Sequence, residues 1–217
     1  MPAQYQICRV ELAKKAILDK DYEKAVKLLD ECLDYPRHLG EGKLYGAQEN
    51  DFYYLLGVAY DAKAKEAELS SHLSPLASHL SEKARECWEE ATKGPQEPAA
   101  AMYYNDAKPD KIFYQGLALL KLGRKDEANG RFYKLINYGK QHLFEHQTMD
   151  YFAVSLPDLL IWEDSLDMKN RIHCLYMLAL GYYGMGDRQH AERYLGEAEQ
   201  LDINHSGIQA LRSLINN

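Results

Sequence analysis

The feature that most constrains the fold is a short pattern of small and bulky residues that occurs four times in the 217-residue chain. In each copy an alanine is followed four residues later by a bulky residue, and three residues after that by a small or apolar one. Residues at this spacing share one face of an α-helix, and a small residue there lets a second helix approach closely. The copies are Ala25, Leu29 and Cys32; Ala84, Trp88 and Ala91; Ala128, Phe132 and Leu135; and Ala191, Leu195 and Ala198.

Each copy is preceded by a stretch that is predicted to form the first helix of a hairpin. Apolar residues recur at helical spacing along the whole chain, and strand signals are almost absent. Small residues occur where the two helices of each hairpin would touch, among them Ala13, Gly57, Gly116 and Ala179. Gly123 and Gly186 stand between the helices of the last two hairpins, where a left-handed glycine ends a first helix.

This arrangement resembles the tetratricopeptide repeat, whose pattern places Leu-Gly-x-x-Tyr in the first helix and Ala-x-x-x-Phe-x-x-Ala in the second. The resemblance implies an all-α fold, a right-handed α-α superhelix or solenoid of four hairpins with insertions. We expect these hairpins at about residues 4–36, 50–95, 110–139 and 170–202 of a single domain, 1–217. A last amphipathic helix over about 206–216, with Ser206 as its cap, is expected to close the end of the solenoid.

The hairpins are predicted to be separated by insertions. The anchor alanines lie 59, 44 and 63 residues apart, whereas an uninterrupted array would space them by about 34 residues. The inserted segments are rich in apolar and aromatic residues, so we expect them to pack on the repeats. They include the strings His38-Leu39-Gly40-Glu41-Gly42-Lys43-Leu44, Tyr103-Tyr104-Asn105-Asp106 and Asp150-Tyr151-Phe152-Ala153-Val154-Ser155-Leu156-Pro157-Asp158.

Together with Phe113-Tyr114-Gln115-Gly116-Leu117-Ala118 and Asn170-Arg171-Ile172-His173-Cys174, these strings resemble the C-terminal helical region of a family of large bacterial proteins. In that family a portion rich in β-sandwiches and similar to glycoside hydrolases precedes tetratricopeptide repeats. The resemblance extends from about Tyr22 to Gly207. It implies that the chain is the helical module of a larger bacterial protein.

The resemblance also implies a function, because tetratricopeptide proteins bind their partners on the concave face formed by the first helices. Transferring that register predicts a binding surface made of Lys14, Asp51, Tyr54, Asp61, Asp110, Phe113, Leu117, Lys121, His173, Tyr176 and Tyr183. Such a surface suits a protein or peptide, or a neighbouring domain of the same polypeptide. Two alternatives stay open: an accessory module that completes a carbohydrate-processing site through Trp162 and Asp164, and a scaffold that forms homo-oligomers.

Charge and composition narrow the range of partners. The net charge is −7 and no run of Lys or Arg is present, which disfavours nucleic acid and anionic membranes as partners. The first residues lack the basic start and apolar core of a secretory signal, and no apolar stretch approaches the roughly 18 residues of a membrane span, so we expect a cytoplasmic protein. Cys8, Cys32, Cys87 and Cys174 are scattered and are expected to be reduced thiols in the core.

Four short motifs contain residue types that occur in chemical sites. His142-Leu143-Phe144-Glu145-His146 matches the H-x-x-E-H zinc pattern but lacks an obvious third ligand. Gly40-Glu41-Gly42-Lys43 lacks phosphate-loop spacing, and the acidic group Glu163, Asp164 and Asp167 suits a helix start. His173 and Cys174 are helix neighbours that cannot form a catalytic pair, so one should face the groove and the other the core. We therefore predict no catalytic residues, no cofactor and no metal.

Overall fold

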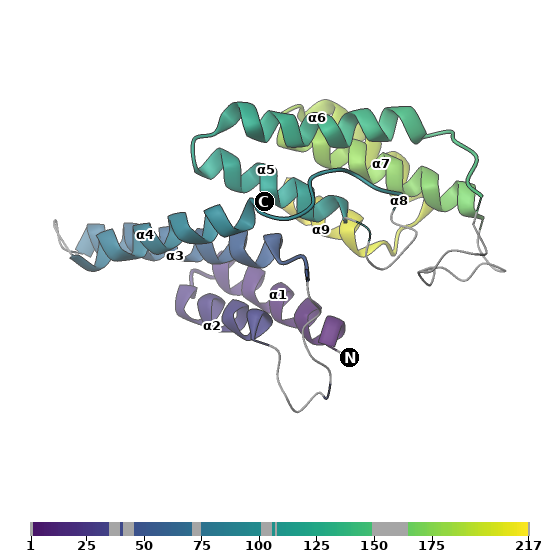
Figure 1. Ribbon diagram of the computed structural model, residues 1–217. Coiled ribbons are helices and arrows are strands. Elements are labelled where there is room, and N and C mark those ends of the chain that lie inside the picture. The colour runs from purple at the N-terminus through teal and green to yellow at the C-terminus, as the bar shows by residue number, and fades with distance from the viewer. Residues whose placement is uncertain are drawn as a thin grey trace. The chain divides into compact units, whose positions relative to one another are not determined.

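The computed structural model describes residues 2–34, 40, 46–70, 75–100, 106, 108–148 and 165–216. Over these residues the chain is helical and contains no strand, which confirms the predicted all-α class. The described helices are α1 (Pro2–Leu18), α2 (Tyr22–Leu33), α3 (Asn50–Ser70), α4 (Pro75–Ala91), α5 (Pro109–Lys121), α6 (Lys125–His142), α7 (Leu166–Gly184), α8 (Arg188–Leu201) and α9 (Ser206–Asn216) (Figure 1). None of these helices combines the length and the apolar character needed to cross a bilayer.

The chain divides into two compact units. The first consists of Met1–Gly94 and Leu117–Arg124, and the second of Pro95–Gly116 and Lys125–Asn217. Helix α5 therefore contributes residues to both units. Parts of the segments expected to be insertions, including 101–105 and 149–164 with Trp162 and Asp164, lie outside the described residues.

In the first unit, α1 packs on α2, α2 on α3, and α3 on α4 (Figure 1). The anchor residues of both hairpins are buried: Ala25, Leu29, Cys32 and Ala91 have no exposed surface, and Trp88 is 8% exposed. The amide of Asn50 joins the two ends of the α3–α4 hairpin. Its Nδ2 donates hydrogen bonds of 2.8 Å to the carbonyl oxygens of both Ala91 and Lys93.

In the second unit, α6 packs on α7, and α7 packs on α8. Phe132, on α6, fits into the notch left by Gly116 on α5, where a Cβ atom would lie 2.6 Å from its Cζ. Helix α9 is fastened to α8 by Arg212, whose Nε and Nη2 donate to the two carboxylate oxygens of Glu199 at 2.9 and 2.7 Å. Arg212 also pairs with Glu192 of α8.

Three of the hairpins share one turn geometry. The second residue after the first helix has a left-handed backbone, with φ of 60° at Lys20, 76° at Gly123 and 80° at Gly186. The next amide then donates to the carbonyl five residues earlier: Asp21 to Ala16 at 2.8 Å, Arg124 to Leu119 at 2.9 Å, and Asp187 to Tyr182 at 2.9 Å. This is the Schellman geometry that ends helices. The predicted left-handed glycines are thus confirmed, and Lys20 adopts the same conformation without being a glycine.

Candidate binding site

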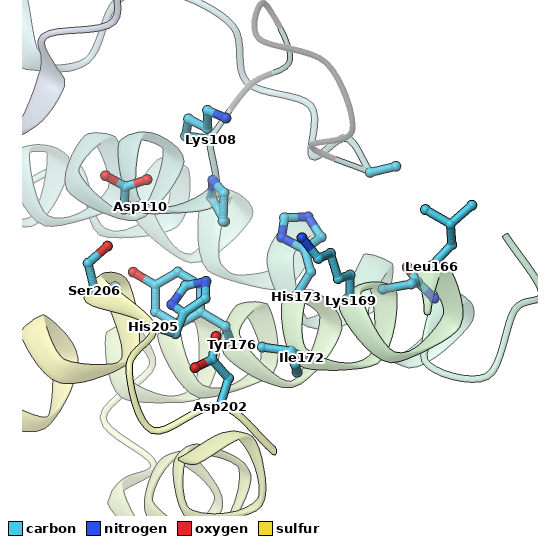
Figure 2. Close-up of a pocket in the computed structure, with 14 residues that line it drawn as sticks. Lys108, Asp110, Leu166, Lys169, Ile172, His173, Tyr176, Asp202, His205 and Ser206 are labelled. Atoms are coloured by element: carbon cyan, nitrogen blue, oxygen red, sulfur yellow. The ribbon is translucent and has the colours of Figure 1, made fainter. Parts of the chain in front are cut away.

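A cavity of about 430 Å³ lies in the second unit, along the first half of α7 (Figure 2). We call it the α7 pocket. The beginnings of α5 and α9 and the α8–α9 connection supply its other walls. Its polar lining residues are Lys108, Asp110, Lys169, Asn170, His173, Tyr176, Asp202, His205 and Ser206, and its less polar ones include Ala100, Pro109, Leu166, Ile172 and Gly207.

The α7 residues that line the pocket lie on one face of the helix because of their spacing. Lys169, His173 and Tyr176 are spaced four and three residues apart, so they share one face of α7. His173 lines the pocket, whereas the neighbouring Cys174 is fully buried and is therefore the member of this pair that faces the core. Asn170 holds the start of α7 in place, because its Nδ2 donates to the carbonyl of His142 at 2.7 Å.

His205 closes the pocket next to the beginning of α9. Its Nδ1 accepts a hydrogen bond of 3.2 Å from the amide of Ile208, so His205, rather than the expected Ser206, caps this helix. An accepting Nδ1 places the proton of the neutral ring on Nε2. Burial lowers the pKa of His205 below its ordinary value, against the opposing effect of the carboxylates of Asp202 and Asp110. The ring also lies 5.2 Å from that of Tyr176.

His173 is held by the segment that precedes α5. Its Nε2 lies 2.8 Å from the carbonyl oxygen of Ala99, and because a carbonyl can only accept, Nε2 carries the proton. Burial lowers the pKa of His173, and the nearby Lys108 and His205 lower it further. Near neutral pH both pocket histidines are therefore uncharged. In that form the Nδ1 atom of His173 is an acceptor and the Nε2 atom of His205 is a donor.

Of the residues predicted for a binding surface, five lie in the second unit. Asp110, His173 and Tyr176 are brought together at the α7 pocket. Phe113 is 1% exposed and lies in the core, with its ring 6.1 Å from that of Phe132 and 6.0 Å from that of Tyr183. Tyr183 is half-buried, and its hydroxyl donates to the carbonyl of Leu214 at 3.2 Å.

The other six predicted residues belong to the first unit. Two of them form ion pairs within their own helix, Lys14 with Glu11 at 2.6 Å and Asp61 with Lys65 at 2.7 Å. Tyr54 packs against the apolar core of this unit, and the ammonium of Lys121 lies 5.6 Å from the centre of the Trp88 ring. Asp51 and Leu117 are half-buried.

The repeat pattern did not predict several residues that line the pocket. Lys169 could have been found, because it lies one turn before His173 on the same face of α7. Lys108, Asp202 and His205 come from connections between helices, for which a helical register makes no prediction. They reach the pocket through the packing of α5, α7 and α9.

The H-x-x-E-H motif does not form a metal site. Helix α6 ends at His142, so the two histidines are not one helical turn apart as the zinc pattern requires. His142 pairs with Glu145, whereas the Nδ1 atom of His146 lies 2.9 Å from Asp167 Oδ2. Throughout the described residues, no group of three or more His, Cys, Asp or Glu side chains could hold a metal ion. Glu163 and Asp164 lie outside those residues.

The chain matches no protein-family model, and no solved structure matches it significantly.

Proposed function

We propose that this chain is a helical-repeat binding module of the tetratricopeptide type. In this proposal the α7 pocket binds a peptide segment of a partner protein, or of a neighbouring domain of the same polypeptide. The observation that carries it is the meeting of Asp110, His173 and Tyr176 at one cavity. All three were expected on the ligand-facing surface from the repeat register alone.

Two further observations support the proposal. The buried anchor alanines and the three equivalent turns at Lys20, Gly123 and Gly186 are the features by which helical hairpins repeat. The pocket, at about 430 Å³, is also within the range of about 300–1,000 Å³ that is usual for ligand sites. Nine of its fourteen lining residues are polar, so hydrogen bonds and charge would orient a peptide there, and Pro109, Leu166 and Ile172 add apolar surface.

The proposal can be tested by nuclear magnetic resonance on the full chain with isotope-labelled backbone amides. A mixture of random hexapeptides at millimolar concentration should shift the amides of Asp110, His173 and Ser206. A Lys169→Trp variant, which fills the pocket, should abolish these shifts. Arg171 is exposed on the same helix outside the pocket, so Arg171→Trp should preserve them. Peptide-induced shifts that map elsewhere, or that survive Lys169→Trp, would contradict the proposal.

A further inference from the structure

The α7 pocket has an acidic side. Figure 2 shows Asp110 and Asp202 on the side where His205 and Ser206 lie. Each carboxylate has a local partner among the described residues: Asp202 Oδ1 accepts from the amide of Asn204 at 2.9 Å, and Asp110 Oδ2 lies 3.7 Å from the ammonium of Lys111. Because a carboxylate accepts through two oxygens, both groups can take a further hydrogen bond from a cationic ligand group.

The opposite side of the pocket carries a cationic group. Lys169 lies there on α7, next to the uncharged ring of His173 (Figure 2). Lys108 is close enough to His173 to lower the pKa of that histidine, and the carboxylate of Asp106 acts on the same pKa in the opposite direction. An ammonium group has three protons, so Lys108 and Lys169 can each bind an anionic ligand group while keeping their contacts within the protein.

This distribution of charge selects among classes of ligand. A purely anionic ligand would meet the carboxylates of Asp110 and Asp202, and a purely cationic ligand would meet the two lysines. A molecule with an ammonium at one end and a carboxylate at the other is complementary to both sides. Pro109, Leu166 and Ile172 add apolar surface for a side chain between the two ends.

We propose that the α7 pocket binds short peptides whose amino and carboxyl ends are both free, with the ammonium directed at Asp110 and Asp202 and the carboxylate at Lys108 and Lys169. This inference rests on the proposed function, because it uses the same pocket for a peptide. It replaces the segment of a longer chain in that proposal by a short peptide with both ends free, whose two charged ends are the recognised groups.

The experiment is calorimetric titration of the full chain with the dipeptide alanyl-leucine and with its N-acetylated, C-amidated and doubly capped forms. Loss of either charged end is expected to weaken binding by about tenfold or more, because each end makes charge-assisted hydrogen bonds. Asp110→Asn should weaken binding of the free dipeptide and leave that of the acetylated form unchanged. Lys169→Met should correspondingly weaken binding of the free dipeptide and leave the amidated form unchanged.

Asp126→Asn and Lys125→Met serve as matched controls, because both residues are exposed at the start of α6 and do not line the pocket. They should bind all four dipeptides as the wild type does. If the doubly capped dipeptide binds as tightly as the free one and Lys169→Trp still abolishes its binding, peptide recognition stands and the zwitterion inference falls. If neither dipeptides nor hexapeptides bind, both proposals fall.

Discussion

The indole ring of Trp88 on α4 lies directly against the backbone of Gly57 on α3. A Cβ atom at residue 57 would be 2.5 Å from Cδ1 of Trp88 and would also overlap the indole nitrogen. Among the described residues that nitrogen has no hydrogen-bond partner, so the ring is held by packing. The α3–α4 hairpin therefore depends on the absence of a side chain at residue 57.

Gly57→Ala is accordingly expected to destabilise the protein by about 2 kcal/mol, because Trp88 is buried and overpacking forces it or the backbone to move. Urea unfolding followed by circular dichroism measures the effect. Gly130→Ala is the matched control: no atom lies within 4 Å of a Cβ placed there, and helix propensity favours alanine by about 0.5–1 kcal/mol. The double variant Gly57→Ala, Trp88→Leu should lose less free energy of unfolding than the sum of the losses of the two single variants. If the two losses simply add, the packing argument is contradicted.

The left-handed backbone of Lys20, with φ of 60°, is unfavourable in free energy because the residue has a Cβ atom. Gly123 and Gly186 adopt the same conformation without this penalty. Lys20→Gly is expected to stabilise the first unit by about 0.5–1 kcal/mol, measured by the urea midpoint. Lys20→Ala removes the charge but keeps the strain, so it should change stability little. Gly186→Ala should destabilise by about 1 kcal/mol, although nothing lies within 4 Å of its added methyl group. A loss of stability in Lys20→Gly would oppose this account.

The helical hairpins could be predicted from the sequence because their determinants are local. Leu29 follows Ala13 by the same 16 residues that separate Phe132 from Gly116 and Leu195 from Ala179. A small residue and the bulky residue opposite it are thus encoded at a fixed distance along the chain. The bulky members are 0% exposed in all three cases, and Phe132 lies directly against the backbone of Gly116.

The candidate site was only partly predictable. Phe113 was assigned to a ligand-facing position, yet Ile112, Phe113, Tyr114 and Gln115 are all at most 7% exposed. Four consecutive residues of a helix point to all sides of its axis, so this part of α5 is buried all round. A repeat register predicts which side of a helix faces a ligand, and here no side is exposed. Asp202 and His205 come from a connection whose path is set by the packing of α9, and no local sequence signal fixes that path.

The four cysteines are expected to differ in reactivity. Burial raises the pKa of Cys32 and of Cys174 to about 12 and that of Cys87 to about 11. Cys8 is exposed, so the predicted core location is wrong for this residue. At about pH 8, iodoacetamide should modify Cys8 rapidly and the other three at least tenfold more slowly, because the thiolate is the reacting form. Peptide mass spectrometry over time measures the rates.

Unfolding the protein in guanidinium chloride gives the control for this comparison. All four thiols should then react at similar rates, since burial no longer separates them. Fast modification of Cys32 or Cys174 in the folded protein would show that its helix opens readily. Cys8→Ser should remove the rapid phase and leave the slow one unchanged.

The pH dependence of stability should reveal the buried His173. Its pKa is lower in the folded protein than in the unfolded chain, so the unfolded chain binds more protons between the two values. Its contribution is therefore complete above the unfolded pKa of about 6.5 and is lost as the pH falls below that value. Thermal unfolding should shift to lower temperature between about pH 7.5 and about pH 5, a range above the ordinary titration of carboxyl groups.

His173→Gln isolates this contribution, because a glutamine amide can still donate to the carbonyl of Ala99 but does not titrate. The variant should lose less stability than the wild type over the same pH range, and His205, whose pKa is also lowered by burial, accounts for part of the remaining loss. His79→Gln changes an exposed histidine on α4 and should preserve the wild-type response. If the unfolding temperature falls equally with pH in His173→Gln and in the wild type, His173 is not the group whose protonation opposes folding.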